Sequence, residues 1–205
     1  MIVIVETTFI IEVVIDQDES PACEEILRLT GPSGHAHLVV PAFSLAEAGM
    51  MLERRQGERK TLIRDLTGRA RNPRGSKVHA RYSKALDELR SELLRVNEAE
   101  DKRFLDFTWS QIGRVETIPL TDDMTYDAIN FRQAGVIAKL PDAIILASIL
   151  GYIDSAPKNE KICFVTPDRA FANPRITTLL RHKCSFLGSF KAAAGWIQKY
   201  SSPSN

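Results

Sequence analysis

Four acidic residues lie where a parallel α/β fold would bring side chains to one place. Glu6 and Asp168 each follow a short apolar run that predicts a buried strand, while Glu47 and Asp142 lie near the starts of predicted helices. In a sheet with right-handed crossovers, strand ends and helix starts meet at the carboxyl edge. Carboxylates a few ångströms apart resist joint ionisation, and hard divalent cations bind oxygen ligands. The pattern predicts an acidic metal site.

Each acid also has a simpler interpretation. Asp142 can complement a helix dipole in the first turn, and Asp168 can form a turn after Pro167. Glu6 and Glu47 fit such roles less well, since each interrupts an apolar stretch where an unpaired carboxylate is costly. The conjunction of all four favours the metal site.

Short β-branched runs alternate with helical patterns along the chain, which indicates an α/β fold with a parallel sheet. The expected strands lie near 2–5, 37–40, 115–119, 161–166 and 184–187. The expected helices cover 8–15, 20–30, 42–56, 58–69, 77–97, 99–112, 122–135, 141–154, 174–182 and 188–199.

The composition is that of a globular protein and selects no partner. The chain has 205 residues, 44% of them hydrophobic, and a formal net charge of +1. Its three cysteines form no short-spaced pair, which favours a reducing cytoplasm over a disulfide framework. The first apolar run is interrupted by Glu6 and Glu12, so we expect neither a signal peptide nor a membrane span.

A basic segment runs from Glu53 to Lys84, with eleven basic residues against three acidic ones. Such a concentration of charge is typical of a surface that binds a phosphate backbone. The alternative is a solvated surface whose charges pair along helices. The candidate nucleic-acid contacts are Arg54, Arg55, Arg69, Arg71, Arg74 and Lys77.

Apolar residues with helical spacing follow this segment and predict a stripe that faces the core, with a dimer seam as the alternative. The stripe consists of Val78, Tyr82, Leu86, Leu89, Leu93 and Val96.

The four acidic segments together resemble the PIN-domain family of nucleases. Residues 3–11 are similar to the family's opening strand and first acid, and residues 41–47 to the helix that carries its second. Residues 140–147 look like its aspartate-alanine helix, and residues 164–171 like its closing strand, threonine, acid and phenylalanine. Four motifs in this order bracket nearly the whole chain.

The chain departs from the family pattern at two positions. Glu6 stands where the family has aspartate, and Ala170 stands where the family usually has a further acid. A glutamate is one methylene longer and can still ligate a metal if the site adjusts.

The resemblance implies a three-layer α/β/α fold whose central parallel sheet has the strand order 3-2-1-4-5. We expect a single PIN-like domain over residues 1–200, a helical insertion at about 56–112 and a disordered tail at 201–205.

The resemblance also implies Mg²⁺- or Mn²⁺-dependent hydrolysis of phosphodiester bonds, in RNA in preference to DNA. Glu6, Asp142 and Asp168 are the expected metal ligands, and Glu47 is a fourth ligand or the base that orients the attacking water. The hydroxyls of Thr7 and Thr166 are expected to hold carboxylates or a phosphate oxygen.

Two other functions stay open, namely a DNA nuclease for single strands or flaps, and a PIN-like scaffold with weak or lost catalysis. The resemblance further suggests a toxin with an antitoxin partner, and a homodimer. The sequence itself predicts no membrane association.

Overall fold

The computed structural model of the chain describes residues 1–31, 34, 36–70, 77–111 and 113–201, without the side chains of 69, 70 and 77–81. The chain divides into two compact units. The sheet unit comprises Met1–Ala48 and Thr108–Asn205, and the helical unit comprises Gly49–Phe107.

A five-stranded, all-parallel sheet forms the centre of the sheet unit. The strands are β1 (Ile2–Ile4), β2 (His37–Pro41), β3 (Glu116–Ile118), β4 (Ile162–Val165) and β5 (Ser185–Leu187). Their order is β3-β2-β1-β4-β5, which confirms the predicted order. In the central register Ile4 lies opposite Val39 on one side and Phe164 on the other.

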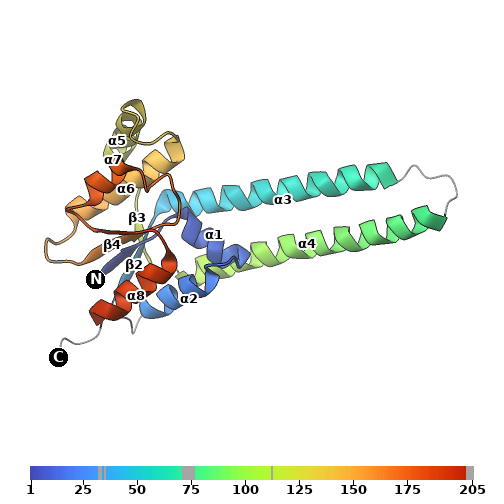
Figure 1. Cartoon of the computed structure of the whole chain (residues 1–205), viewed down its shortest axis with the longest axis horizontal. Coiled ribbons are helices and arrows are strands. Elements are labelled where there is room, and N and C mark those ends of the chain that lie inside the picture. Colours follow the sequence, from blue (N-terminus) through green and yellow to red (C-terminus); the bar gives the residue numbers. More distant parts are fainter. Residues whose placement is uncertain (32–33, 35, 71–76, 112, 202–205) are drawn as a thin grey trace. The chain divides into compact units, whose positions relative to one another are not determined.

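Helices cover both faces of this sheet, which confirms the predicted three-layer α/β fold (Figure 1). One face carries α1 (Thr7–Ile15), α2 (Ser20–Leu29) and α8 (Phe190–Ser201). The other carries α5 (Asp122–Gln133), α6 (Leu140–Ser155) and α7 (Pro174–Leu180).

Alternation along the buried strands gives each face its own core. Ile2 and Ile4 of β1 belong to the cluster that α5 and α6 cover, and successive side chains of a strand point to opposite faces. On the α1 and α8 side, the rings of Phe9 and Phe190 meet edge to face with centroids 5.3 Å apart. Because strands buried on both faces need apolar residues at every position, β1 and β4 read as continuous hydrophobic runs.

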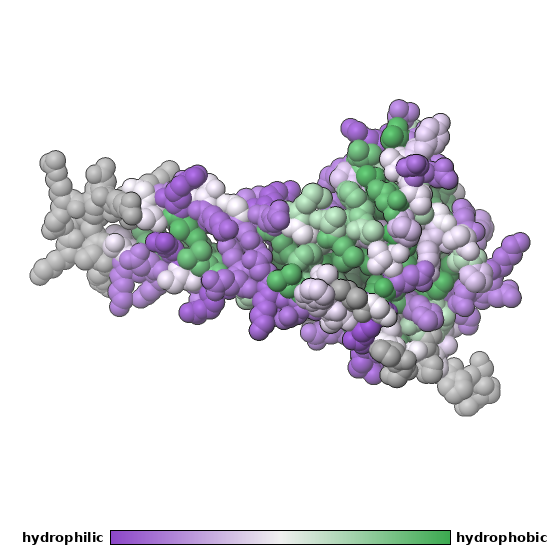
Figure 2. Space-filling model, turned by 180° about the vertical axis from the view of Figure 1, so that it is seen from behind, coloured by the Kyte–Doolittle hydropathy of each residue, from purple (hydrophilic) through white to green (hydrophobic). Residues whose placement is uncertain are grey.

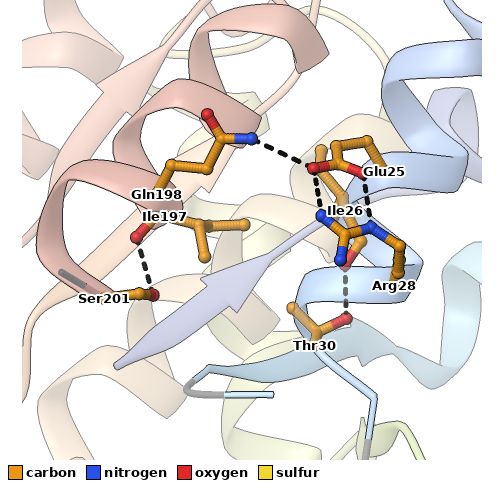
Figure 3. A network of polar contacts seen from close by, with 7 residues as sticks. All are labelled: Glu25, Ile26, Arg28, Thr30, Ile197, Gln198 and Ser201. Carbon is orange, nitrogen blue, oxygen red and sulfur yellow. Dashed lines mark hydrogen bonds and ion pairs between the residues drawn. The ribbon is translucent and has the colours of Figure 1, made fainter. Parts of the chain in front are cut away.

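A polar network joins α2 and α8 on the outer side of that layer (Figure 3). The Arg28 guanidinium donates to both carboxylate oxygens of Glu25, at 2.6 and 2.7 Å, and Gln198 donates to Glu25 Oε1 at 3.0 Å. Thr30 and Ser201 bond to backbone carbonyls four residues earlier, at 2.8 Å each. Ser201 therefore belongs to α8, so the prediction of a disordered tail is wrong at this residue, and residues 202–205 lie outside the described part.

Two long antiparallel helices make up the helical unit, where four shorter ones were expected. They are α3 (Ala42–Ala70) and α4 (Lys77–Gln111), although the first residues of α3 and the last residues of α4 belong to the sheet unit. The predicted break at Gly57 is absent from α3, because one glycine costs a helix only about 1 kcal/mol when good helix formers flank it. The predicted break at Glu98 is likewise absent from α4. The assignment of these residues to an insertion in one domain stays a prediction.

A nearly buried ion pair joins α3 to α4. The Arg59 guanidinium donates to both oxygens of Glu100 at 2.7 Å and to Asn97 Oδ1 at 2.6 Å, and the Glu100 side chain is only 2% exposed. Arg59, which the sequence placed in the basic segment, therefore holds the two helices together.

The described part of the predicted nucleic-acid surface includes Arg54 and Arg55. Arg54 lies 3.8 Å from Glu58 with both side chains exposed, and Arg55 is half-buried. Arg71 and Arg74 lie outside the described residues, as do the side chains of Arg69 and Lys77, so the nucleic-acid role of this segment stays a prediction.

The predicted core stripe of α4 is wrong at two positions. Tyr82 is 63% exposed and Leu89 is 43% exposed, while Leu86, Leu93 and Val96 are half-buried. Figure 2 shows apolar side chains interrupting the hydrophilic surface of the long helices. Helical spacing identifies the residues that share a face, but it does not identify what covers that face. In the described residues, no helix has both the length and the apolar character needed to span a membrane.

We predict that Arg59→Met destabilises the helical unit by about 3–5 kcal/mol, because it leaves the buried Glu100 carboxylate without its counter-charge. Amide hydrogen exchange of α3 and α4 measures the loss. The matched control is Arg54→Met, which removes an exposed pair and should change stability by less than about 1 kcal/mol. Equal protection in the two variants would contradict the structural role of Arg59.

Candidate metal centre

Glu6 occupies the junction between β1 and α1, and its carboxylate is 2% exposed. As the N-cap of α1 it accepts a hydrogen bond at Oε2 from the Thr8 backbone N–H, at 2.9 Å. Its Oε1 accepts a hydrogen bond from the Thr166 hydroxyl, at 2.8 Å. Burial raises the pKa of Glu6 to about 7, against the opposing effect of these hydrogen bonds.

Thr166 links Glu6 to Asp168 across two neighbouring strands. The Thr166 hydroxyl donates to Glu6 and accepts from the Asp168 backbone N–H, at 2.9 Å. Asp168 Oδ1 accepts from the Ala170 backbone N–H, at 2.8 Å, which fixes this half-buried carboxylate in the turn after β4. The charge of Asp168 also raises the pKa of Glu6, so the two carboxylates lie within electrostatic range.

Glu47 joins the same group through Thr7. The buried Thr7 hydroxyl donates to Glu47 Oε2 over 2.5 Å, which ties the first turn of α1 to α3. Since Glu47 belongs to the sheet unit, this contact lies within one compact unit.

Asp142 lies in the first turn of α6, after Pro141. Burial raises the pKa of this half-buried carboxylate above its usual value, and the Lys139 ammonium opposes that shift. The charges of Asp168 and Glu47 raise the Asp142 pKa further. The four predicted acids therefore form one electrostatically coupled set.

The position of this set follows from the strand order. β1 pairs with β2 on one side and with β4 on the other. From β1 the chain adds β2 and β3 toward one edge of the sheet and then β4 and β5 toward the opposite edge, so the strand order reverses between β1 and β4. Open parallel sheets bind ligands outside the carboxyl ends of their strands at such a point. Glu6 and Asp168 lie on the two sides of it, directly after β1 and β4.

The donor set has the chemistry that a hard divalent cation requires. All four side chains offer carboxylate oxygens, which Mg²⁺ and Mn²⁺ prefer. A desolvated carboxylate with a raised pKa, as at Glu6, is one that a cation would stabilise in its ionised form. The four carboxylates are electrostatically coupled but are not grouped as the ligands of one ion, because within the described residues no set of three or more His, Cys, Asp or Glu side chains is arranged to hold a metal ion.

A pocket of about 360 Å³ borders Asp142, and the sequence analysis did not identify its basic residues. Arg132, Lys139 and Arg169 line it together with Asp142. The only available signal was proximity in sequence, since Lys139 lies three residues before Asp142 and Arg169 directly follows Asp168.

No protein-family model matches the sequence, and no curated protein matches it. The crystal structure of VapBC2 from Rickettsia felis bound to a DNA fragment from their promoter is similar to this chain with a TM-score of 0.44. The two are 13% identical, and the match covers 91% of this chain and 98% of that chain. This level of similarity does not define a family for the chain.

We predict that the stability of the wild-type protein falls as pH rises from 4.5 to about 7 because of Glu6. In this window the unfolded chain has ionised Glu6 while the folded protein keeps the proton, so unfolding releases a proton. A shift of this size corresponds to about 3 kcal/mol. Glu6→Gln removes the titrating group, so the free energy of unfolding should lose that amount of its decrease between pH 4.5 and about 7. Denaturant unfolding in EDTA at a series of pH values measures it.

The matched control is Asp18→Asn, which removes an exposed carboxylate from the same unit and should leave the slope unchanged. Parallel curves for Glu6→Gln and the wild type would exclude Glu6 as the titrating group. An NMR titration of the Glu6 carboxyl carbon provides an independent second measurement.

Proposed function

We propose that the protein is a metal-dependent nuclease that hydrolyses phosphodiester bonds in RNA. The observation that supports this most directly is the pair Glu6 and Asp168, which lie on either side of the break in strand order and are linked through Thr166. Asp142 lies within electrostatic range of both Asp168 and Glu47. Coupled carboxylates at the carboxyl edge of a parallel sheet suit metal-assisted hydrolysis.

Each acidic side chain has a role in this proposal. Asp142, Asp168 and Glu6 would hold Mg²⁺ or Mn²⁺, which when bound would supply positive charge for the scissile phosphate and a lowered pKa for an attacking water molecule. Glu47 is a further ligand, or it accepts the proton of the attacking water. Thr166 orients Glu6 and Thr7 orients Glu47 through their hydroxyl groups.

Attack by water, in preference to a ribose hydroxyl, would leave a 5′-phosphate and a 3′-hydroxyl. The choice of RNA over DNA rests on the resemblance to PIN-domain nucleases, because the same metal chemistry serves both polymers. An antitoxin partner, a homodimer and a cytoplasmic location stay predictions.

We predict that the purified protein cleaves single-stranded RNA in Mg²⁺ or Mn²⁺ and that EDTA abolishes the cleavage. The measurement uses end-labelled RNA, single-stranded DNA and duplex DNA of matched sequence, with products resolved by gel. Cleavage of DNA alone would show that the protein is a DNA nuclease and not a ribonuclease. No cleavage of any polymer by folded protein would favour the scaffold function.

Asp142→Asn and Asp168→Asn should each lower the rate of cleavage by at least ~100-fold, because each removes a carboxylate that would hold the metal ion. The matched control is Asp154→Asn, which makes the same substitution near the other end of α6, where Asp154 pairs with Lys183 in an exposed position. The control should retain its activity. A near-wild-type rate in either site variant would show that cleavage does not depend on that carboxylate.

A further inference from the structure

The pocket beside Asp142 is more basic than a metal site alone requires. Its walls come from the end of α5, the loop from α5 to α6, and the turn after β4. Arg132, Lys139 and Arg169 line it, against the single carboxylate of Asp142. In the described part of the chain, none of these three cations forms an ion pair with a carboxylate. With three cations against one carboxylate, the pocket has a formal excess of two positive charges.

The size and the chemistry of the pocket both fit a phosphorylated small group. Its volume of about 360 Å³ lies in the range of pockets that bind small molecules. Arginine presents a planar fork of donors that matches a phosphate, and lysine adds a compact positive charge. Lys139 also lowers the pKa of Asp142, so its charge lies within electrostatic range of that carboxylate.

The loop that forms one wall is held in place by the start of α7. Arg175 Nη1 donates to the carbonyl oxygens of Ala134 and Gly135, at 3.0 and 3.1 Å. Asn173 Nδ2 donates to the Val136 carbonyl at 3.4 Å. Gly135 adopts a φ of +65°, a conformation that glycine takes without strain. A wall fixed by these bonds needs little ordering when a ligand binds.

We propose that this pocket is a nucleotide subsite, in which Arg132, Lys139 and Arg169 bind a phosphate of the nucleic-acid strand next to the metal-binding carboxylates. The proposal rests on the nuclease function proposed above and gives that function a defined substrate contact. The neighbouring sugar and base occupy the remaining volume. Ala170, which lines the pocket beside Arg169, adds no negative charge where the PIN-like pattern has an acid.

Binding of uridine 5′-monophosphate to the full chain in EDTA tests the subsite without any cleavage. Chemical-shift titration should give saturable binding with shifts in the loop 134–139, and uridine without its phosphate should bind at least about tenfold more weakly. Arg132→Gln and Arg169→Gln should each weaken the binding of the monophosphate by about tenfold, since each removes a hydrogen bond to a charged group. Both arginines are exposed, so their replacement leaves the core unchanged.

The matched control is Arg181→Gln, an exposed arginine at the other end of α7, which should bind the monophosphate as the wild type does. Unchanged affinity in both site variants would overturn the subsite, as would equal affinities for uridine and its monophosphate. Inorganic phosphate that binds as tightly as the monophosphate would overturn the claim of nucleotide size. Binding of a polyglutamate peptide without any binding of the monophosphate would also overturn it, in favour of an acidic protein partner.

These outcomes separate the subsite from the reaction. Monophosphate binding by a protein that cleaves no polymer would support the subsite and contradict the nuclease function. Cleavage without monophosphate binding would support the nuclease function and contradict the subsite.

Discussion

The burial of one carboxylate, that of Glu6, is the constraint on which the rest of the site depends. The side chain lies just after β1, which is in the middle of the sheet, and helices cover both faces there. A carboxylate in that position is costly unless its oxygens are bonded. Thr166 and the first turn of α1 supply those bonds, so the same contacts that make the burial tolerable also fix the ends of β1 and β4 against each other.

The raised pKa of Glu6 shows that these hydrogen bonds only partly offset the burial. Asp168 adds a repulsive charge, and Asp142 experiences the charges of both Asp168 and Glu47. Lys139 is the one cation whose effect on this set is resolved among the described residues, and it acts on Asp142. A set with this excess of negative charge costs stability, which is common at functional sites.

The fold followed from the sequence, and so did the places of the acids near strand ends and helix starts, whereas the surroundings of the acids did not. Short apolar runs before Glu6 and Asp168 predicted strand ends at one edge, because parallel strands with right-handed crossovers leave little choice. The pocket beside Asp142 depends on the path of the loop 134–139, which Arg175 fixes from a distant element, and no local pattern reports such a contact. The continuity of α3 through Gly57 was also missed. The low helix propensity of one glycine is a weak guide when the residues on both sides favour a helix.

Glu6 stands where the PIN-like pattern has an aspartate, and its carboxylate can still bind a cation. A carboxylate has about four lone-pair directions, and Glu6 accepts hydrogen bonds from the Thr166 hydroxyl, the Thr8 backbone N–H and the Thr8 side chain. The carboxylate therefore keeps capacity for one further ligand. Because the Glu6 pKa lies at about 7, a cation bound there would compete with a proton near neutral pH. Proton release and metal binding would then be coupled at the carboxylate that also joins β1 to β4, which links the charge of the site to the packing of the sheet.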